Sequence, residues 1–312
     1  MVIDIILLLV GFVLLIKGAD FFVDGSSSLA KLIGIPGFVI GLTVVAMGTS
    51  APEAAVSISA GVSGKNDIAI SNIVGSNIFN LLVVAGMSAV IKPYKIEKTI
   101  LNRDIPVNVV VSAVLLVMML IGRLLGWIDG IVLLAMFIGY LAFVLISAFK
   151  NRESNTDSEI KTMSPILSAV CIIGGLAAVI FGGNMVVNNA VDIAEKLHWS
   201  ETFIGLTIVA LGTSLPELVT SIVAAKKGES GLALGNVIGS NLFNILFVLG
   251  MSSVISPIAV DSGMIINAII MLALTAIVYV FCLIRKGIGR VIGGICVAVY
   301  VAYTTYLIMT TV

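Results

Sequence analysis

Charged residues are scarce in this sequence. Only 11% of its 312 residues are Asp, Glu, Lys or Arg, against roughly 25% in a typical soluble domain. Hydrophobic residues make up 59%, and the mean hydropathy is +1.20. So little charge cannot cover a surface that faces water. The composition therefore excludes an ordinary soluble domain and indicates a chain embedded in a lipid bilayer.

An excess of positive charge and metal-binding clusters of Cys and His are also lacking. Lys and Arg number 17, as do Asp and Glu, so the net charge is +0, and a nucleic-acid partner is not expected. There is one His, and the 3 cysteines lie in apolar runs without metal-ligand spacing. We expect Cys171, Cys282 and Cys296 to be small buried hydrophobes.

Apolar segments long enough to cross a bilayer, which takes about 20 residues, fill most of the chain. They are residues 2–23, 39–62, 67–91, 104–122, 128–149, 164–187, 203–225, 232–256, 263–284 and 288–310. No basic residue precedes the first segment, which we expect to be a retained helix and not a signal peptide. The sequence thus predicts an all-α polytopic membrane protein of ten transmembrane helices. Its expected parts are a first five-helix repeat (1–149), a short linker (150–163) and a second five-helix repeat (164–312).

The two halves carry the same long motifs. GLTVVAMGTSAPE ends at Glu53 and GSNIFN ends at Asn80, while GLTIVALGTSLPE and GSNLFN end at Glu217 and Asn244. Both motifs recur at an offset of 164 positions. Because each half holds an odd number of expected spans, the second half enters the membrane from the opposite side. Such inverted repeats are typical of transporters that bind their substrate near the bilayer midplane, at broken helices.

Basic residues are concentrated in the loops that follow odd-numbered spans. These loops hold Lys31, Lys92, Lys95, Lys98, Arg103, Lys150, Arg152, Lys161, Lys226, Lys227, Arg285, Lys286 and Arg290. The loops after even-numbered spans hold only Lys65, Arg123 and Lys196. The positive-inside rule then predicts a cytoplasmic linker, with both termini outside the cell membrane.

Two carboxylates lie inside expected spans. Glu53 belongs to the second span and Glu217 to the seventh. Burying a charge in a bilayer is unfavourable, so such residues are candidates for function. Each follows a proline, Pro52 or Pro216, which is expected to kink its helix and leave a main-chain carbonyl without its usual donor.

Other polar residues share the helix faces of these glutamates. Steps of three and four place Ala46, Thr49, Ser50 and Ser57 beside Glu53, with copies at Ala210, Thr213, Ser214 and Ser221. In the next span, Asn72, Ser76 and Asn80 follow at steps of four, with copies at Asn236, Ser240 and Asn244. We assign Ser76, Asn80, Ser240 and Asn244 to the site. Hydrogen bonds between helices are the expected role of Asn72, Asn77, Asn236 and Asn241.

The candidate ligands are all oxygen atoms. Oxygen ligands suit hard cations, and calcium accepts 6–8 of them in flexible geometry. Two glutamates would balance the charge of one divalent ion. Magnesium needs a tighter octahedron and fits less well, whereas sodium could use the same oxygens.

The motifs GTSAPE with GSNIFN, and GTSLPE with GSNLFN, resemble the paired alpha repeats of sodium/calcium exchangers in the cation/calcium antiporter superfamily. The short linker resembles the prokaryotic type, which lacks a regulatory loop domain. The resemblance implies that Glu53 and Glu217 are calcium ligands, assisted by the main-chain carbonyls of Thr49 and Thr213. It also implies flanking sodium sites formed by Ser50, Ser76, Asn80, Ser214, Ser240, Asn244 and the carbonyls of Ala46 and Ala210. Potassium-dependent relatives carry Asp in place of Asn80 or Asn244, so the resemblance argues against potassium transport.

The expected function is therefore sodium/calcium antiport by alternating access. A calcium/proton antiporter is the alternative, and a cation channel is a further one. An enzyme would need a nucleophile with its base, and Ser50 or Ser214 beside a glutamate only weakly imitates that arrangement. No cofactor is expected. The expected partners are calcium, sodium and the lipid bilayer, with no obligatory protein partner evident.

Overall fold

The computed structural model describes residues 1–64, 66–150, 162–199, 208 and 210–311. Long α-helices dominate this part of the chain: α1 (Val2–Ile33), α4 (Ala51–Val62), α5 (Asn66–Phe79), α7 (Ile105–Leu120), α8 (Trp127–Lys150), α9 (Pro165–Lys196), α12 (Leu215–Lys227), α13 (Ser230–Phe243), α15 (Ser262–Arg285) and α16 (Arg290–Thr311). Shorter helices are α2 (Gly37–Ile40), α3 (Ala46–Thr49), α6 (Ala85–Ile91), α11 (Ala210–Gly212) and α14 (Gly250–Ile255). Four π-helical turns continue them: η1 (Gly41–Val45), η2 (Asn80–Val84), η3 (Ile100–Asp104) and η5 (Asn244–Leu249).

Membrane-spanning helices account for most of the described residues. Eight helices are long and apolar enough to cross a bilayer, and the bent pair Gly37–Thr49 and Ala51–Val62 brings the described total to nine. The seventh expected span, 203–225, begins outside the described residues, and α11 and α12 are its described part. Most of the expected linker, 150–163, also lies outside them. The structure thus confirms a helical protein that crosses the membrane many times.

The first and sixth expected spans are longer than predicted. Apolar runs suggested 2–23 and 164–187, whereas α1 continues to Ile33 and α9 to Lys196. Asp24 and three consecutive serines interrupt the apolar run of α1 but do not break the helix. The helix ends where Gly34 adopts a left-handed conformation with φ 67°.

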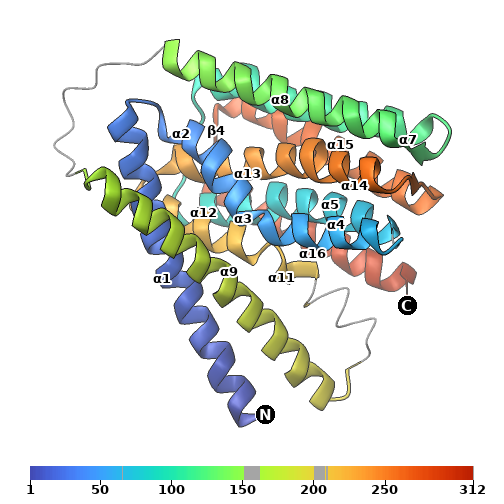
Figure 1. Ribbon diagram of the computed structural model, residues 1–312, viewed down its shortest axis with the longest axis horizontal. Helices are drawn as coiled ribbons and strands as arrows, with labels where there is room; N and C mark the ends of the chain where they lie inside the picture. The colour runs from blue at the N-terminus through green and yellow to red at the C-terminus, as the bar shows by residue number, and fades with distance from the viewer. Residues whose placement is uncertain (65, 151–161, 200–207, 209, 312) are drawn as a thin grey trace.

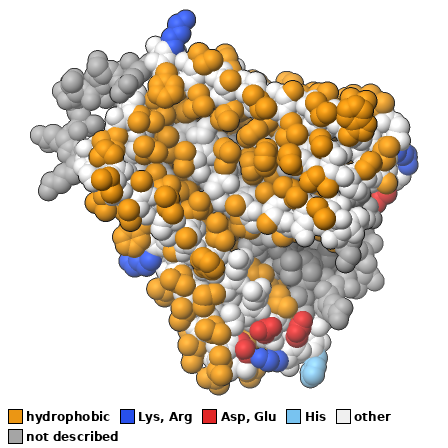
Figure 2. Space-filling model, viewed as in Figure 1, with side chains coloured by type: hydrophobic (Ala, Val, Ile, Leu, Met, Phe, Trp, Pro, Cys, Tyr) orange, Lys and Arg blue, Asp and Glu red, His pale blue; other side chains and the backbone are white. Residues whose placement is uncertain are grey.

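The helices form a central group and an outer group (Figure 1). The spans Ile68–Ile91 and Ser230–Ile255 are 83% and 94% buried, whereas the other continuous spans are 11–39% buried. Hydrophobic side chains cover much of the visible face, and the charged side chains seen on it lie near its edges (Figure 2). Many isoleucine, leucine, valine and phenylalanine side chains are exposed. This distribution is that of a protein whose outer helices face lipid.

Helices α1 and α9 lie side by side and cross the bundle obliquely (Figure 1). Glycines bring their backbones together. A Cβ atom on Gly18 would lie 2.9 Å from the carbonyl oxygen of Gly175, and one on Gly175 would lie 2.8 Å from that of Gly18. Because any larger side chain would separate them, α1 and α9 pack as one close pair.

Two short ribbons link the repeats. Strand β1 (Tyr94–Lys95) pairs antiparallel with β4 (Gly287–Ile288), and β2 (Leu124–Leu125) pairs antiparallel with β3 (Ile258–Ala259). Tyr94 donates a 3.3 Å hydrogen bond to the Ala85 carbonyl, and burial raises the pKa of its phenol above the usual range. Both ribbons therefore join an element of the first half to one of the second.

Candidate functional site

Each candidate glutamate lies in the first turn of a helix that begins after a break. Glu53 is the third residue of α4, and Glu217 is the third residue of α12. The predicted kink at Pro52 is confirmed as a 49° bend between Thr49 and Ala51. Proline is tolerated at the start of a helix because the first N–H groups have no intrahelical acceptor. The amino-terminal end of a helix dipole favours a negative charge, so this placement suits a buried carboxylate.

Two serines hold the glutamates in reciprocal fashion. Ser50 Oγ donates to Glu217 Oε1 at 2.7 Å, and Ser214 Oγ donates to Glu53 Oε1 at 2.9 Å. All four side chains are completely buried. Ser50 precedes Glu53 by one helical turn, as Ser214 precedes Glu217. Each break thus supplies a carboxylate and a donor to the opposite carboxylate, which places the two breaks together inside the bundle.

The second oxygen of each carboxylate has no protein partner. Glu53 Oε2 and Glu217 Oε2 are buried without a hydrogen bond among the described residues. Several predicted site residues share this property in the same part of the structure: Ser76 Oγ, Ser240 Oγ, Asn80 Oδ1, Asn244 Oδ1 and Thr213 Oγ1. Buried polar atoms are normally paired, so this many unpaired oxygens in one region is unusual. A bound cation would satisfy them, and the donor set of carboxylate, amide and hydroxyl fits a hard cation.

The helices that carry these oxygens are in contact. α5, with Ser76, packs against α4 and α11, and α13, with Ser240, packs against α3 and α12. Asn80 and Asn244 begin the π-helical turns η2 and η5 that continue α5 and α13. A Cβ atom on Gly239, next to Ser240, would lie 2.7 Å from Ala46 Cβ, so α13 and α3 approach closely. The structure therefore brings together the helices that carry most of the predicted site residues.

At each break, one asparagine joins two helices, as predicted. Asn72 Nδ2 donates to Ser57 Oγ at 2.9 Å and to the Glu53 carbonyl at 3.4 Å. In the second repeat, Asn236 Nδ2 donates to Ser221 Oγ at 2.9 Å and to the Glu217 carbonyl at 3.4 Å. The interhelical role predicted for Asn72 and Asn236 is confirmed, and it fixes the backbone at each glutamate.

Asn77 and Asn241 also join helices, and Asn77 does more than was predicted. Asn77 Nδ2 donates to the Asn241 carbonyl at 3.2 Å, and Asn241 Nδ2 donates to the Asn77 carbonyl at 3.3 Å. Asn77 Oδ1 accepts from Asn244 Nδ2 at 3.1 Å. This contact orients the Asn244 amide, leaving its oxygen without a partner. No spacing pattern in the sequence indicates this contact between Asn77 and Asn244.

For the remaining predicted residues, the structure gives contacts but does not test the expected role as an ion ligand. Thr49 Oγ1 donates to Asn236 Oδ1 at 3.1 Å and to the Ala46 carbonyl at 3.4 Å, so its hydroxyl links helices. The Ala46 carbonyl also accepts from the Ser50 N–H at 3.0 Å. Ala210 begins α11, and its side chain lies outside the described ones. The carbonyl-ligand roles of Ala46, Ala210, Thr49 and Thr213 stay predictions.

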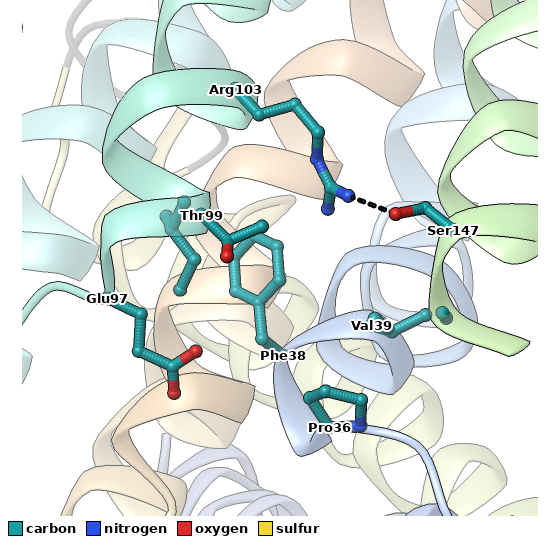
Figure 3. Close-up of a pocket in the computed structure, with 9 residues that line it drawn as sticks. Pro36, Phe38, Val39, Glu97, Thr99, Arg103 and Ser147 are labelled. Carbon is teal, nitrogen blue, oxygen red and sulfur yellow. Dashed lines mark hydrogen bonds between the residues drawn. The ribbon is translucent and has the colours of Figure 1, made fainter. Parts of the chain in front are cut away.

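A second polar cluster, which we did not predict, lies at a small cavity (Figure 3). Arg103 is paired with the fully buried Asp104, Nε to Oδ1 at 2.9 Å, and donates to Ser147 Oγ at 3.2 Å. Tyr140 also donates to Asp104, at 2.9 Å. The cavity, of about 100 Å³, is lined by Arg103, Ser147, Glu97, Thr99 and mostly apolar neighbours. The hydrogen bonds to Ser147 and Tyr140 join η3 to α8. Asp104 balances the charge of Arg103, and the cluster contains none of the predicted site residues.

Taken together, the apolar outer surface and the many spanning helices define a polytopic helical membrane protein. The profile of the sodium/calcium exchanger protein family matches residues 3–146 and 167–309, nearly the whole chain. The chain belongs to this family, whose members are ion exchangers.

Similar proteins agree with this assignment. The chain is 33% identical over 345 residues to the sodium/calcium exchanger MaX1 of Methanosarcina acetivorans, with 98% of each chain covered. It is 38% identical over 263 residues to the inner membrane protein YrbG of Escherichia coli, covering 82% of this chain and 81% of that protein. A solved structure of the sodium-calcium exchanger NCX_Mj, soaked with Na⁺ and Ca²⁺, superposes with a TM-score of 0.86 at 34% identity and 97% coverage of both chains. The predicted family and its link to cation/calcium exchange are thereby confirmed.

Proposed function

We propose that this chain is a secondary active antiporter that exchanges sodium for calcium by alternating access, with both ions bound at Glu53 and Glu217. The observation that carries the proposal is the pair of buried carboxylates, each held by a serine of the other repeat. Each keeps one oxygen without a protein partner. An unpaired buried charge is strongly unfavourable, and a bound cation offsets that cost.

Calcium is the divalent ion that this donor set suits best. Two carboxylates match a double positive charge, and the neighbouring amide and hydroxyl oxygens can complete a large, irregular coordination shell. Sodium would use the oxygens of Ser50, Ser76, Asn80 and their copies in the second repeat. The names of MaX1 and NCX_Mj describe those proteins as exchangers of the same two ions, which supports this choice.

We further propose ten spans arranged as two inverted repeats. The hydrogen bonds at the two breaks correspond at the 164-residue offset: Asn72 to Ser57, and Asn236 to Ser221. At the same offset β1 corresponds to β3, and β2 to β4 within one residue. However, β1 pairs with β4, which is the copy of β2, and β2 pairs with β3, which is the copy of β1. This exchange of partners is what a two-fold axis within the membrane plane would produce.

A difference between equivalent helix pairs supports alternating access. α1 packs along α12, whereas α9 makes at most slight contact with α4, its equivalent partner. Two inverted halves related by exact symmetry would pack alike. The structure therefore has the asymmetry expected of one state of a transporter that opens to each side in turn. By the distribution of Lys and Arg, the linker side faces the cytoplasm, in a cell membrane with both termini outside.

Calcium flux into proteoliposomes under imposed ion gradients tests the proposed function. We expect calcium uptake when sodium is loaded inside and absent outside, with little uptake when only a proton gradient is imposed. Uptake driven by protons alone would replace the proposal with calcium/proton antiport. Uptake that needs no opposing gradient and saturates only weakly would indicate a channel.

A further inference from the structure

One side chain ties α1 to a helix of the candidate site. Lys227, in the last turn of α12, lies 2.7 Å from Asp24 Oδ1 and 3.3 Å from Asp20 Oδ1. Its Nζ also donates to the Asp20 carbonyl at 2.9 Å. Asp20 and Asp24 are one turn apart on α1, so both face the same end of α12. The contact lies on the side of the molecule that carries the loop after α12, which we call the linker side.

The repeat extends to α1 and α9. At the same offset of 164, Gly11 and Gly18 of α1 correspond to Gly175 and Gly182 of α9. Asp20 and Asp24 then correspond to Asn184 and Asn188, and Lys227 corresponds to Ser63. The corresponding positions on α9 and at the end of α4 therefore carry none of these three charges.

The two interfaces also differ in packing. Asp20 and Asp24 are half-buried where α1 lies along α12. Asn184, Asn188 and Ser63 are exposed, and α9 makes at most slight contact with α4. The charged interface is thus the closed one, and the uncharged interface is the open one.

We propose that Asp20, Asp24 and Lys227 form a one-sided ionic latch that favours the state closed on the linker side. The proposal rests on the alternating access proposed above. Two identical inverted repeats would give two states of equal free energy, related by a two-fold rotation. Any preference between the states must come from residues that differ between the repeats, and a contact that exists in only one state shifts the population toward that state.

A neighbouring ion pair does not contribute to this asymmetry in the same way. Lys31 lies 3.7 Å from Glu229, the residue that precedes α13, so this pair joins α1 to the turn between α12 and α13. Its counterparts in the sequence are Glu195 and Lys65, which are again of opposite sign. Lys65 lies outside the described residues. Of the charges that join α1 to α12 or to the turn after it, those at positions 20, 24 and 227 are therefore the ones that differ between the repeats.

Hydrogen–deuterium exchange of the full chain in lipid nanodiscs tests the latch. The variant Asp20→Asn with Asp24→Asn gives α1 the residues that α9 has. We expect exchange in residues 20–33 and 220–228 to rise about two- to ten-fold, the range for loss of partly exposed ion pairs. Residues 55–63 and 184–196 should become more protected, because the opposite interface closes as the latched one opens. Raising the ionic strength with choline chloride should shift the natural chain the same way and the variant much less.

Two further variants complete the test. Lys17→Gln removes an exposed charge 3.8 Å from Asp20 without touching Lys227, and we expect no shift. Ser63→Lys with Asn184→Asp and Asn188→Asp builds the latch on the other side, and it should protect residues 55–63 and 184–196. Faster exchange at residues 20–33 without added protection at 184–196 would mean local fraying and would overturn the latch. Hydrogen–deuterium exchange needs no ion flux. It can therefore disprove the latch while sodium/calcium exchange is confirmed, or support the latch while sodium/calcium exchange is disproved.

Discussion

The hydroxyl of Ser50 donates a 2.7 Å hydrogen bond to Oε1 of Glu217, although the two residues belong to different repeats. Ser214 makes the same contact with Glu53 at 2.9 Å. Each carboxylate is therefore oriented by the break that carries the other one. Neither repeat can form this arrangement alone, and a relative movement of the two breaks changes both carboxylates.

Replacing either serine should weaken calcium transport. In Ser50→Ala, Glu217 Oε1 loses its donor, and an unsatisfied buried acceptor costs about 1–3 kcal/mol. We expect the KM for calcium to rise about tenfold in Ser50→Ala and in Ser214→Ala, measured as initial uptake into proteoliposomes. Ser59→Ala, an exposed change on the same helix α4, should behave like the natural chain. An unchanged KM in both site variants would contradict the orienting role.

The reciprocal pair Asn77 and Asn241 should contribute to stability. Asn77→Ala removes the donor to the Asn241 carbonyl and the acceptor for Asn244. Hydrogen bonds between membrane helices contribute about 0.6–2 kcal/mol, so we expect a loss of about 1 kcal/mol on unfolding in detergent. The exposed Asn102→Ala is the matched control. Equal stability of the two variants would show that the pair does not hold α5 to α13.

The close pair α1 and α9 can be tested with two neighbouring glycines. A Cβ atom on Gly175 would meet the backbone of Phe22 at 2.5 Å, while one on Gly174 has nothing within 4 Å. We expect Gly175→Ala to lower the melting temperature and the transport rate. Gly174→Ala should keep both, or gain up to about 1 kcal/mol from its helix preference. Similar behaviour of the two variants would argue against tight packing at Gly175.

The orientation predicted from the basic loops has a direct test. A cysteine placed at Ser154, within the expected linker, should react with an impermeant reagent only from the cytoplasmic side. The natural cysteines are replaced first, and a cysteine at exposed Ser63 serves as the opposite-side control. Labelling of position 154 from outside alone would reverse the proposed topology.

Much of the architecture could be predicted because lipid constrains the sequence strongly. Apolar segments located the spans, and the repeated motifs located Glu53 and Glu217. Pro52 indicated the bend that the structure shows at Ser50. Asn72 and Asn236 were expected between helices because amides inside a bilayer need partners, and both join helices at a break.

Features that depend on tertiary contacts escaped prediction. The polar end of α1 appeared too hydrophilic to extend the first span, but it is helical and packs against α9 and α12. Arg103 was expected in the loop before the fourth span, but the structure includes it in the span Ile100–Leu120, where it pairs with the buried Asp104. Asn77 was expected only to join helices, because its contact with Asn244 depends on how α5 and η5 cross.

If sodium and calcium share the oxygens around Glu53 and Glu217, as proposed, the two ions compete, and equilibrium calcium binding in nanodiscs measures this competition. We predict that the apparent Kd for calcium rises steadily with sodium concentration in the natural chain. Glu53→Gln and Glu217→Gln should remain folded and lose measurable calcium binding, while the partly exposed Glu229→Gln should bind normally. Calcium binding that sodium does not weaken, or that survives unchanged in folded Glu53→Gln, would contradict the shared site.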